Sequence, residues 1–289
     1  MAFHSLEEMV RICNETNLAF WEIVLREDMS ERSVSKESSF EMMEHMWEAM
    51  KEAVEKYEPQ KTSASGLVGT MGAKIEEYRN KQKPLCGDFV SKVMERALQM
   101  GESNACMKRI VAAPTAGACG VLPAVLIPLY EEGRVTSEEI IPALYTAAGI
   151  GQVIAARAFI AGAAGGCQAE IGTASAMAAG ALVSIQGGNA QQIIHAAAMA
   201  LKNLLGLVCD PVAGLVEVPC VKRNVVGAVN ALTAADMALA GIISRISPDQ
   251  VIDAMREVGE SMHVSLKETG EGGIANTPDA RKIKEELGI

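Results

Sequence analysis

The chain has 289 residues, enough for a sizeable core in one domain or two. Its 36 acidic residues outnumber its 26 basic ones, and the net charge of -10 argues against a nucleic-acid-binding surface. The first residues are acidic where a secretory signal needs a basic patch and an apolar run, so we expect a cytoplasmic protein. In that reducing compartment, seven cysteines indicate metal ligands or reactive thiols rather than disulfides.

The segment up to residue 59 is rich in charge and methionine, and its apolar residues recur at helical spacing. Ser5 with Glu8, and Ser38 with Glu41, each match a capping box, so the sequence predicts two helices here. We expect these helices to form an arm packed on or next to a single helical domain that spans residues 1–289.

Glycines and hydroxyl side chains fill the stretch KTSASGLVGTMGAK, residues 61–74, and predict a loop. After it, one theme repeats: a glycine-containing turn followed by an Ala-rich apolar helix. Capping patterns predict helices over residues 136–161, 189–206 and 248–259. Extended runs of Val, Ile and Thr between hairpin turns are scarce, so the predicted fold is all-α, with buried Ala/Gly-rich helices and glycine-containing loops.

Residues 171–201 contain no charged side chain, which raises the question of a membrane span. The stretch is mostly Ala and Gly, includes several Gln and Asn residues, and has no aromatic belt at either end. We therefore expect closely packed core helices and no membrane partner.

Three cysteines stand in or beside glycine- or proline-bearing turns: Cys167 in GGCQAE, Cys209 in VCDPV and Cys220 in VPCVKRN. Such turns let the backbone approach a bulky inorganic group and hydrogen-bond its sulfides. The CxxC pairs typical of zinc sites are absent from the sequence. Three thiolates without a nearby fourth suit an iron-sulfur cluster with one open iron, and buried structural thiols are the alternative.

Four segments together resemble the catalytic part of the bacterial iron-sulfur-dependent L-serine dehydratases: IVAAPTAGACGVLPAVL, GGCQAEIGTASAMAAGALV, NLLGLVCDPVAGLVEVPCVKRN and KETGEGGIAN. They span most of the chain between Ser63 and Asn276. In that family the three matching cysteines, here Cys167, Cys209 and Cys220, bind a [4Fe-4S] cluster whose fourth iron takes the substrate. The resemblance implies an L-serine ammonia-lyase of amino-acid catabolism and gluconeogenesis, in which the cluster acts as a Lewis acid and pyridoxal phosphate is not needed.

Two departures from single-chain members bear on partners. Those members carry an additional N-terminal domain, whereas this chain begins almost directly with the catalytic part. It thus resembles the α subunit of the two-chain form, which implies a β subunit with an ACT-type domain and a loop containing serine and histidine. Some single-chain members end in a cysteine that enters the active site, and we expect no such self-capping from Gly288-Ile289.

The resemblance also implies which residues meet the substrate. The turn APTAGACG, residues 113–120, leads into a helix whose first N–H groups suit an anion, and an ordinary N-cap turn is the alternative. The implied substrate-binding residues are Thr115, Ala116, Gly117, Ser63, Ser65 and Gly66. The proton acceptor stays open among Lys267, Glu268, Glu170 and a residue of the partner, and Lys74 is a further catalytic candidate.

Polar side chains follow each of the three cysteines. They are Gln168 and Glu170, then Asp210, then Lys222, Arg223 and Asn224. Groups of these kinds orient the ligands of a cluster and tune it, and a solvated surface is the alternative for the basic pair.

Two other functions fit parts of the pattern. An iron-sulfur lyase acting on L-cysteine or L-threonine would share much of the motif set. A non-catalytic electron carrier would favour four complete thiolate ligands, and the three-cysteine pattern argues against it.

Overall fold

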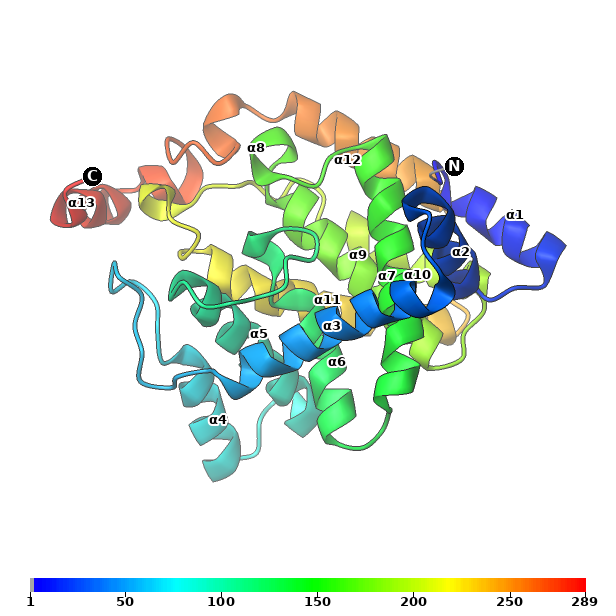
Figure 1. The fold of residues 1–289 in the computed structure, drawn as a ribbon. Helices are drawn as coiled ribbons and strands as arrows, with labels where there is room; N and C mark the ends of the chain where they lie inside the picture. Colours follow the sequence, from blue (N-terminus) through cyan, green and yellow to red (C-terminus); the bar gives the residue numbers. More distant parts are fainter. Residues whose placement is uncertain (1–2) are drawn as a thin grey trace.

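The computed structural model describes residues 3–289, and within them the chain forms thirteen α-helices joined by short 3-10 or π-helical turns. No β-strand occurs in this range, only isolated bridges, so the all-α prediction is confirmed. The α-helices, shown in Figure 1, are α1 (Leu6–Thr16), α2 (Phe20–Arg32), α3 (Lys36–Glu55), α4 (Met71–Lys81), α5 (Gly87–Ala105), α6 (Val121–Glu131), α7 (Ser137–Arg157), α8 (Gly162–Gly165), α9 (Thr173–Ile185), α10 (Ala190–Lys202), α11 (Cys220–Leu239), α12 (Pro248–Ser261) and α13 (Pro278–Leu287). The short turns are η1 (Ala116–Ala118), η2 (Gln168–Gly172), η3 (Val212–Gly214), η4 (Val264–Leu266) and η5 (Gly273–Asn276).

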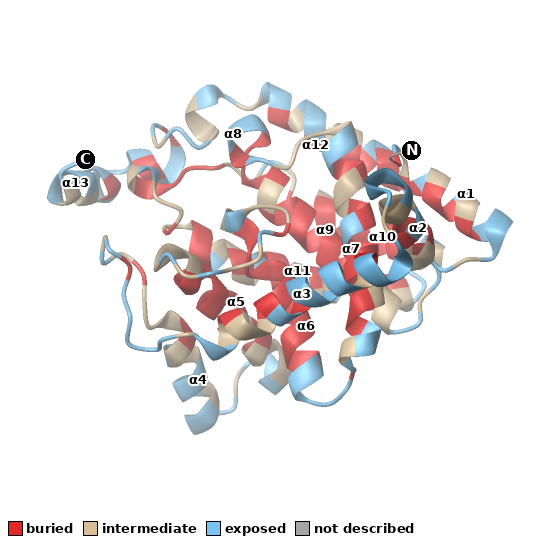
Figure 2. Cartoon of the chain, viewed as in Figure 1, coloured by how far each residue is buried: buried red, intermediate tan, exposed pale blue. Residues whose placement is uncertain are grey.

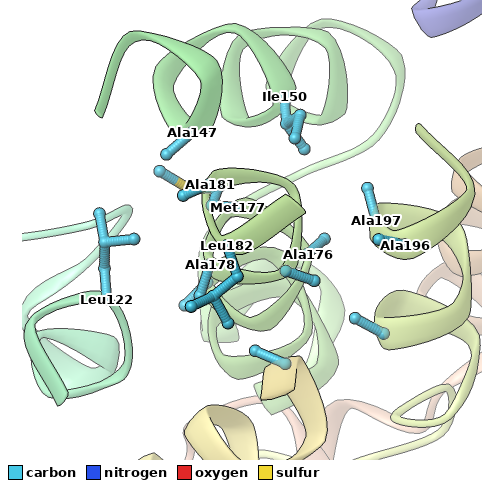
Figure 3. Close-up of a cluster of buried hydrophobic side chains, with 14 of the residues drawn as sticks. Leu122, Ala147, Ile150, Ala176, Met177, Ala178, Ala181, Leu182, Ala196 and Ala197 are labelled. Atoms are coloured by element: carbon cyan, nitrogen blue, oxygen red, sulfur yellow. The ribbon is translucent and has the colours of Figure 1, made fainter. Parts of the chain in front are cut away.

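Helix α9 lies at the centre of the molecule and packs against α6, α7, α10 and α11. Figure 3 shows its small side chains, among them Ala176, Ala178 and Ala181, facing residues of the surrounding helices. Ala and Gly let helix axes approach closely, because little side-chain volume separates the backbones. The Ala-rich sequence of α9 therefore produces a helix that is buried on nearly every side, as Figure 2 shows.

The uncharged stretch at residues 171–201 forms η2, α9 and α10. The two α-helices have 13 residues each, fewer than the roughly 20 that a membrane span needs. Within residues 3–289, only α7 is long and apolar enough to cross a membrane by length and composition. Its most apolar window is 61% buried in the structure, and α7 packs on α9 and α2 as a core helix does.

The N-terminal region forms three helices, and the expectation of two was wrong. Asn17 ends α1 in the left-handed conformation, and α2 begins after Ala19, whose N–H is bonded by the Glu22 carboxylate. The predicted capping box at Ser38 was also wrong, since Ser35 caps α3 by accepting the Ser38 N–H. Serine is a favoured N-cap residue at both positions, but only Ser38 has a Glu three residues later, so the capping-box pattern favoured the wrong serine.

The first helix is attached to α12 through a buried carboxylate. Asp249, in the first turn of α12, accepts the Ser5 hydroxyl at 2.6 Å and the Leu6 N–H at 2.8 Å. Ser5 in turn accepts the Glu8 N–H, which confirms the predicted start of α1. Helices α2 and α3 pack on α7, so all three N-terminal helices contact the rest of the chain. The division into one domain with an arm stays a prediction.

The later helix starts agree with the capping patterns. Thr136, Asn189 and Ser247 are the N-caps of α7, α10 and α12. Helices α7 and α10 end about four residues before the predicted boundaries, since the backbone leaves the helical conformation at Ala158 and short turns follow α10. The predicted loop at residues 61–74 ends at Thr70, because the buried carboxylate of Glu102 accepts the first N–H groups of α4.

Gly180 tests the close packing of α9. A β-carbon at this position would lie 2.1 Å from Cδ1 of the fully buried Ile150. We expect Gly180→Val to lower the free energy of unfolding by about 1–3 kcal/mol, because the core cannot expand without strain. Urea denaturation measures this loss.

Ala155→Val is the matched control, since Ala155 is exposed on α7. Its cost should stay within the helix propensity difference, below about 0.7 kcal/mol. Equal unfolding midpoints for the two variants would contradict the packing argument.

Candidate functional site

The three cysteines singled out in the sequence converge on one region. Cys167 directly precedes the π-helical turn η2, which continues into α9, and Cys220 is the first residue of α11. Cys209 lies in an extended segment paired with the glycine loop near Lys267: its N–H donates to the Leu266 carbonyl at 2.8 Å. Helix N-termini carry a partial positive charge that stabilises thiolates, so two of the three thiols stand where an anion is favoured.

All three thiols are buried, with 3–8% of each residue exposed. Burial raises the pKa of Cys167 to about 11 and that of Cys220 to about 12, and the Cys167 charge adds to the rise at Cys220. The pKa of Cys209 is raised by burial and then by the charges of Cys167, Glu170 and Cys220. Charge on Cys167 therefore opposes ionisation of Cys209 and of Cys220, and burial opposes ionisation of all three thiols.

A glycine leaves space beside the thiols. Among residues 3–289, no group of three or more His, Cys, Asp or Glu side chains that could hold a single metal ion is found. Gly162 adds room beside the thiols, because a β-carbon there would lie 2.8 Å from Cys209 Sγ and 2.9 Å from Glu170 Oε2.

Gln168 connects two of the cysteine segments. Its side chain is fully buried, with Oε1 accepting the Gly206 N–H at 2.9 Å and Nε2 donating to the Met255 carbonyl at 3.1 Å. Its backbone N–H donates to the Leu207 carbonyl at 2.9 Å. The segment before Cys209 is therefore fixed to the start of η2.

Glu170 lies beside the thiols and is bonded to the turn at residues 113–120. Its Oε1 accepts the Thr115 hydroxyl at 2.7 Å, and a β-carbon on Gly117 would lie 3.3 Å from the same oxygen. Burial raises the pKa of Glu170 above its ordinary value, against the opposing Thr115 hydrogen bond, and the Glu268 charge raises it further. Of the predicted proton acceptors, Glu170 is thus a partly shielded carboxyl beside the cysteines.

The turn at residues 113–120 is fixed by Asn224 in α11. The buried Asn224 amide accepts the Gly120 N–H at 2.8 Å and donates to the Gly117 carbonyl at 2.9 Å. Within residues 3–289, the N–H groups of Ala116 and Gly117 donate to no acceptor. These two groups are therefore free to donate to a ligand, and the substrate-binding role of this turn stays a prediction.

Ser63 and Ser65 are held by a residue that the sequence analysis missed. Both hydroxyls donate to Oε2 of the buried Glu217, at 2.8 Å and 2.5 Å. Glu217 lies between Cys209 and Cys220, so the loop is attached to the cysteine segment. The contact joins residues more than 150 positions apart. In the sequence, the only hint is the place of an acidic residue among apolar neighbours.

The remaining candidates lie at the edge of this region or away from it. Lys267 is half-buried beside Cys209, and the exposed Glu268 donates its N–H to the Cys209 carbonyl at 2.8 Å. Gly66 is exposed in the loop, with φ of 75°. Lys74 is exposed on α4, which packs mainly on α5, and no hydrogen bond or ion pair links it to the cysteine segments.

Comparison with known proteins shows the family of this chain. A family model described as serine dehydratase alpha chain matches residues 15–275. The chain belongs to the serine dehydratase alpha-chain family. The match covers all three cysteines, the 113–120 turn and the 61–70 loop, so every part of the candidate site lies within the family region.

Relatives in this family align over nearly the whole chain. The probable L-serine dehydratase alpha chain of Bacillus subtilis is 46% identical, covering 99% of this chain and 95% of that protein. The L-serine dehydratase alpha chain of Peptoniphilus asaccharolyticus is 41% identical, with 98% of each chain covered. The L-serine dehydratase of Mycobacterium tuberculosis is 37% identical, and the match covers 95% of this chain but 61% of that longer protein.

Glu217 is expected to control the order of the 61–70 loop. In Glu217→Ala, two charge-assisted hydrogen bonds are lost, so hydrogen exchange at the Leu67 and Val68 amides should accelerate about tenfold or more. Hydrogen-exchange mass spectrometry of the loop peptide reads this directly.

The control is Glu58→Ala, which removes exposed pairs to Lys61 and Lys108 near the same loop. Such surface pairs contribute little, so loop exchange should stay close to that of the unchanged protein. If both variants exchange alike, Glu217 does not hold the loop.

Proposed function

We propose that this chain is the catalytic α subunit of an L-serine dehydratase, converting L-serine to pyruvate and ammonia. The carrying observation is the convergence of three buried thiols, two of them at helix N-termini, beside a turn with two unpaired N–H groups. The relatives named L-serine dehydratase alpha chain support the same reaction.

Cys167, Cys209 and Cys220 would hold a [4Fe-4S] cluster. Their burial and mutual charge effects fit such a group. When bound with one open iron, the cluster supplies a Lewis acid for the substrate hydroxyl, a poor leaving group on its own. The chain contributes the burial of the three cysteines, and charge interactions are stronger in a buried setting than in water.

The residues around the thiols have separate tasks in this proposal. The N–H groups of Ala116 and Gly117 bind the substrate carboxylate, since they are unpaired and precede α6. Glu170 takes the α-proton: burial raises the pKa of its carboxyl, which makes the carboxylate a stronger base, and the Thr115 hydroxyl orients it by donating a hydrogen bond. Ser63, Ser65 and Gly66 shape the substrate side of the pocket through the Glu217-anchored loop.

We further propose a β subunit as partner and a cytoplasmic location. The alpha-chain names of the relatives imply a second chain, and the longer Mycobacterium protein holds additional sequence outside the match. An ACT-type domain in that partner, with a loop near the active site, follows from the family resemblance. The reaction would serve amino-acid catabolism and gluconeogenesis.

The ligand assignment predicts a specific pattern of loss. Replacing Cys167, Cys209 or Cys220 by Ala should abolish bound iron and sulfide, the visible absorption and serine-dependent pyruvate formation in anaerobically purified protein. Cys13→Ala is the control, because Cys13 is equally buried but belongs to α1. A single site variant that keeps the wild-type iron content would remove its cysteine from the ligand set.

The base assignment predicts a large kinetic effect. Glu170→Gln keeps the Thr115 hydrogen bond but cannot accept the proton, so kcat should fall about 100- to 10,000-fold. The cluster spectrum should persist, which separates lost chemistry from lost metal.

Glu271→Gln provides a control at an exposed carboxylate of the glycine loop and should leave kcat nearly unchanged. Near-normal turnover in Glu170→Gln would instead direct the assignment to Lys267 or Glu268. Assays with L-threonine and L-cysteine in the unchanged protein test the alternative substrates.

A further inference from the structure

An enclosed ion pair joins α11 to the Cys209 segment. The side chains of Arg223 and Asp210 are 12% and 3% exposed, and Nη2 of the arginine donates to Oδ1 of the aspartate at 2.7 Å. Arg223 Nη1 donates to the Val208 carbonyl at 2.7 Å. Val208 and Asp210 flank Cys209. One guanidinium therefore binds the backbone carbonyl on one side of this cysteine and the carboxylate on the other.

The second oxygen of Asp210 holds the glycine loop. Its Oδ2 accepts the Ile274 N–H at 2.7 Å. Gly273 lies against the same carboxylate with φ of 59°, and a β-carbon there would lie 2.4 Å from Oδ2. Only glycine allows this approach, so the loop sequence and the buried carboxylate are matched to each other.

The charge of Arg223 also bears on Cys167. It lowers the pKa of this thiol, against the larger opposing effect of burial. Through its bonds to Val208 and Asp210, this one side chain contacts both neighbours of Cys209 and, through Asp210, is linked to the loop at residues 269–276.

We propose that Arg223 and Asp210 act as one positioning pair, which holds the loop at residues 269–276 against the cysteine site and sets the reduction potential of the group bound there. The inference rests on the proposed function in its second half, because the potential belongs to the proposed cluster. Neither residue touches the substrate in this assignment. An enclosed positive charge bonded to both neighbours of a ligand cysteine stabilises the more negative, reduced form of a cluster.

The loop is tested through the Ile274 amide. Asp210→Asn keeps the shape of the side chain but replaces the charged acceptor, so exchange of this amide should accelerate about tenfold or more. The measurement needs no bound cluster and therefore stands apart from the proposed function.

Glu95→Gln is the matched control. It disrupts another enclosed ion pair, Arg79–Glu95 at 3.2 Å between α4 and α5, with Glu95 only 2% exposed. Exchange in residues 269–276 should be unchanged in this variant. Equal exchange of the Ile274 amide in Asp210→Asn and Glu95→Gln would overturn the loop half of the proposal.

The potential is tested by redox titration of the anaerobically purified full chain. Arg223→Gln should lower the midpoint potential of the cluster, whereas Arg223→Lys, which keeps the charge, should shift it less. Because Arg223→Gln leaves Asp210 buried without its counter-ion, the double variant with Asp210→Asn serves if the single variant does not fold. Because the double variant also loses the opposing negative charge of Asp210, its midpoint potential should fall less than that of Arg223→Gln and still lie below that of the unchanged chain.

A midpoint potential in these variants equal to that of Glu95→Gln would overturn the second half. A wild-type chain that binds no iron or sulfide would overturn the proposed function and this half with it. The Ile274 exchange result would still decide the role of Asp210 in holding the loop.

Discussion

The burial of three cysteine side chains within reach of one another's charge is the constraint on which the rest of the site depends. Cys167, Cys209 and Cys220 lie within reach of one another's charge, and burial penalises ionisation at each of them. The surrounding structure offsets part of this cost with the starts of η2 and α11 and with the guanidinium of Arg223. A cationic inorganic group would offset the remainder.

The Ala-rich core gives this region its rigidity. Helix α11 begins at Cys220, and Cys167 leads through η2 into α9, which is enclosed by its neighbours, as Figure 3 shows. A helix packed on all sides cannot shift without strain, so its first residue is held in a defined position. The small side chains of α9, which resemble a membrane segment in the sequence, thus allow the close packing that holds the site at the helix ends in place.

Local chemistry in the sequence was enough for several helix starts and for singling out the three cysteines in turns. Thr136, Asn189 and Ser247 have capping signals within four residues of the helices they begin. Contacts between distant residues were not predictable in this way. The contacts of Glu217 with Ser63 and of Glu102 with the start of α4 depend on how the whole chain folds. At the start of α3 the sequence pattern favoured Ser38, whereas Ser35 is the cap.

Asp249 has a consequence that reaches across the molecule. Its carboxylate stabilises the first turn of α1, and the helix that carries it, α12, rests on α8 and η2 beside Cys167. Helix α12 thus connects the start of α1 to the region of Cys167. A peptide fused ahead of Ser5, or a cut there, is therefore expected to disturb the contact between α1 and α12, even though this end of the chain is distant from the cysteines.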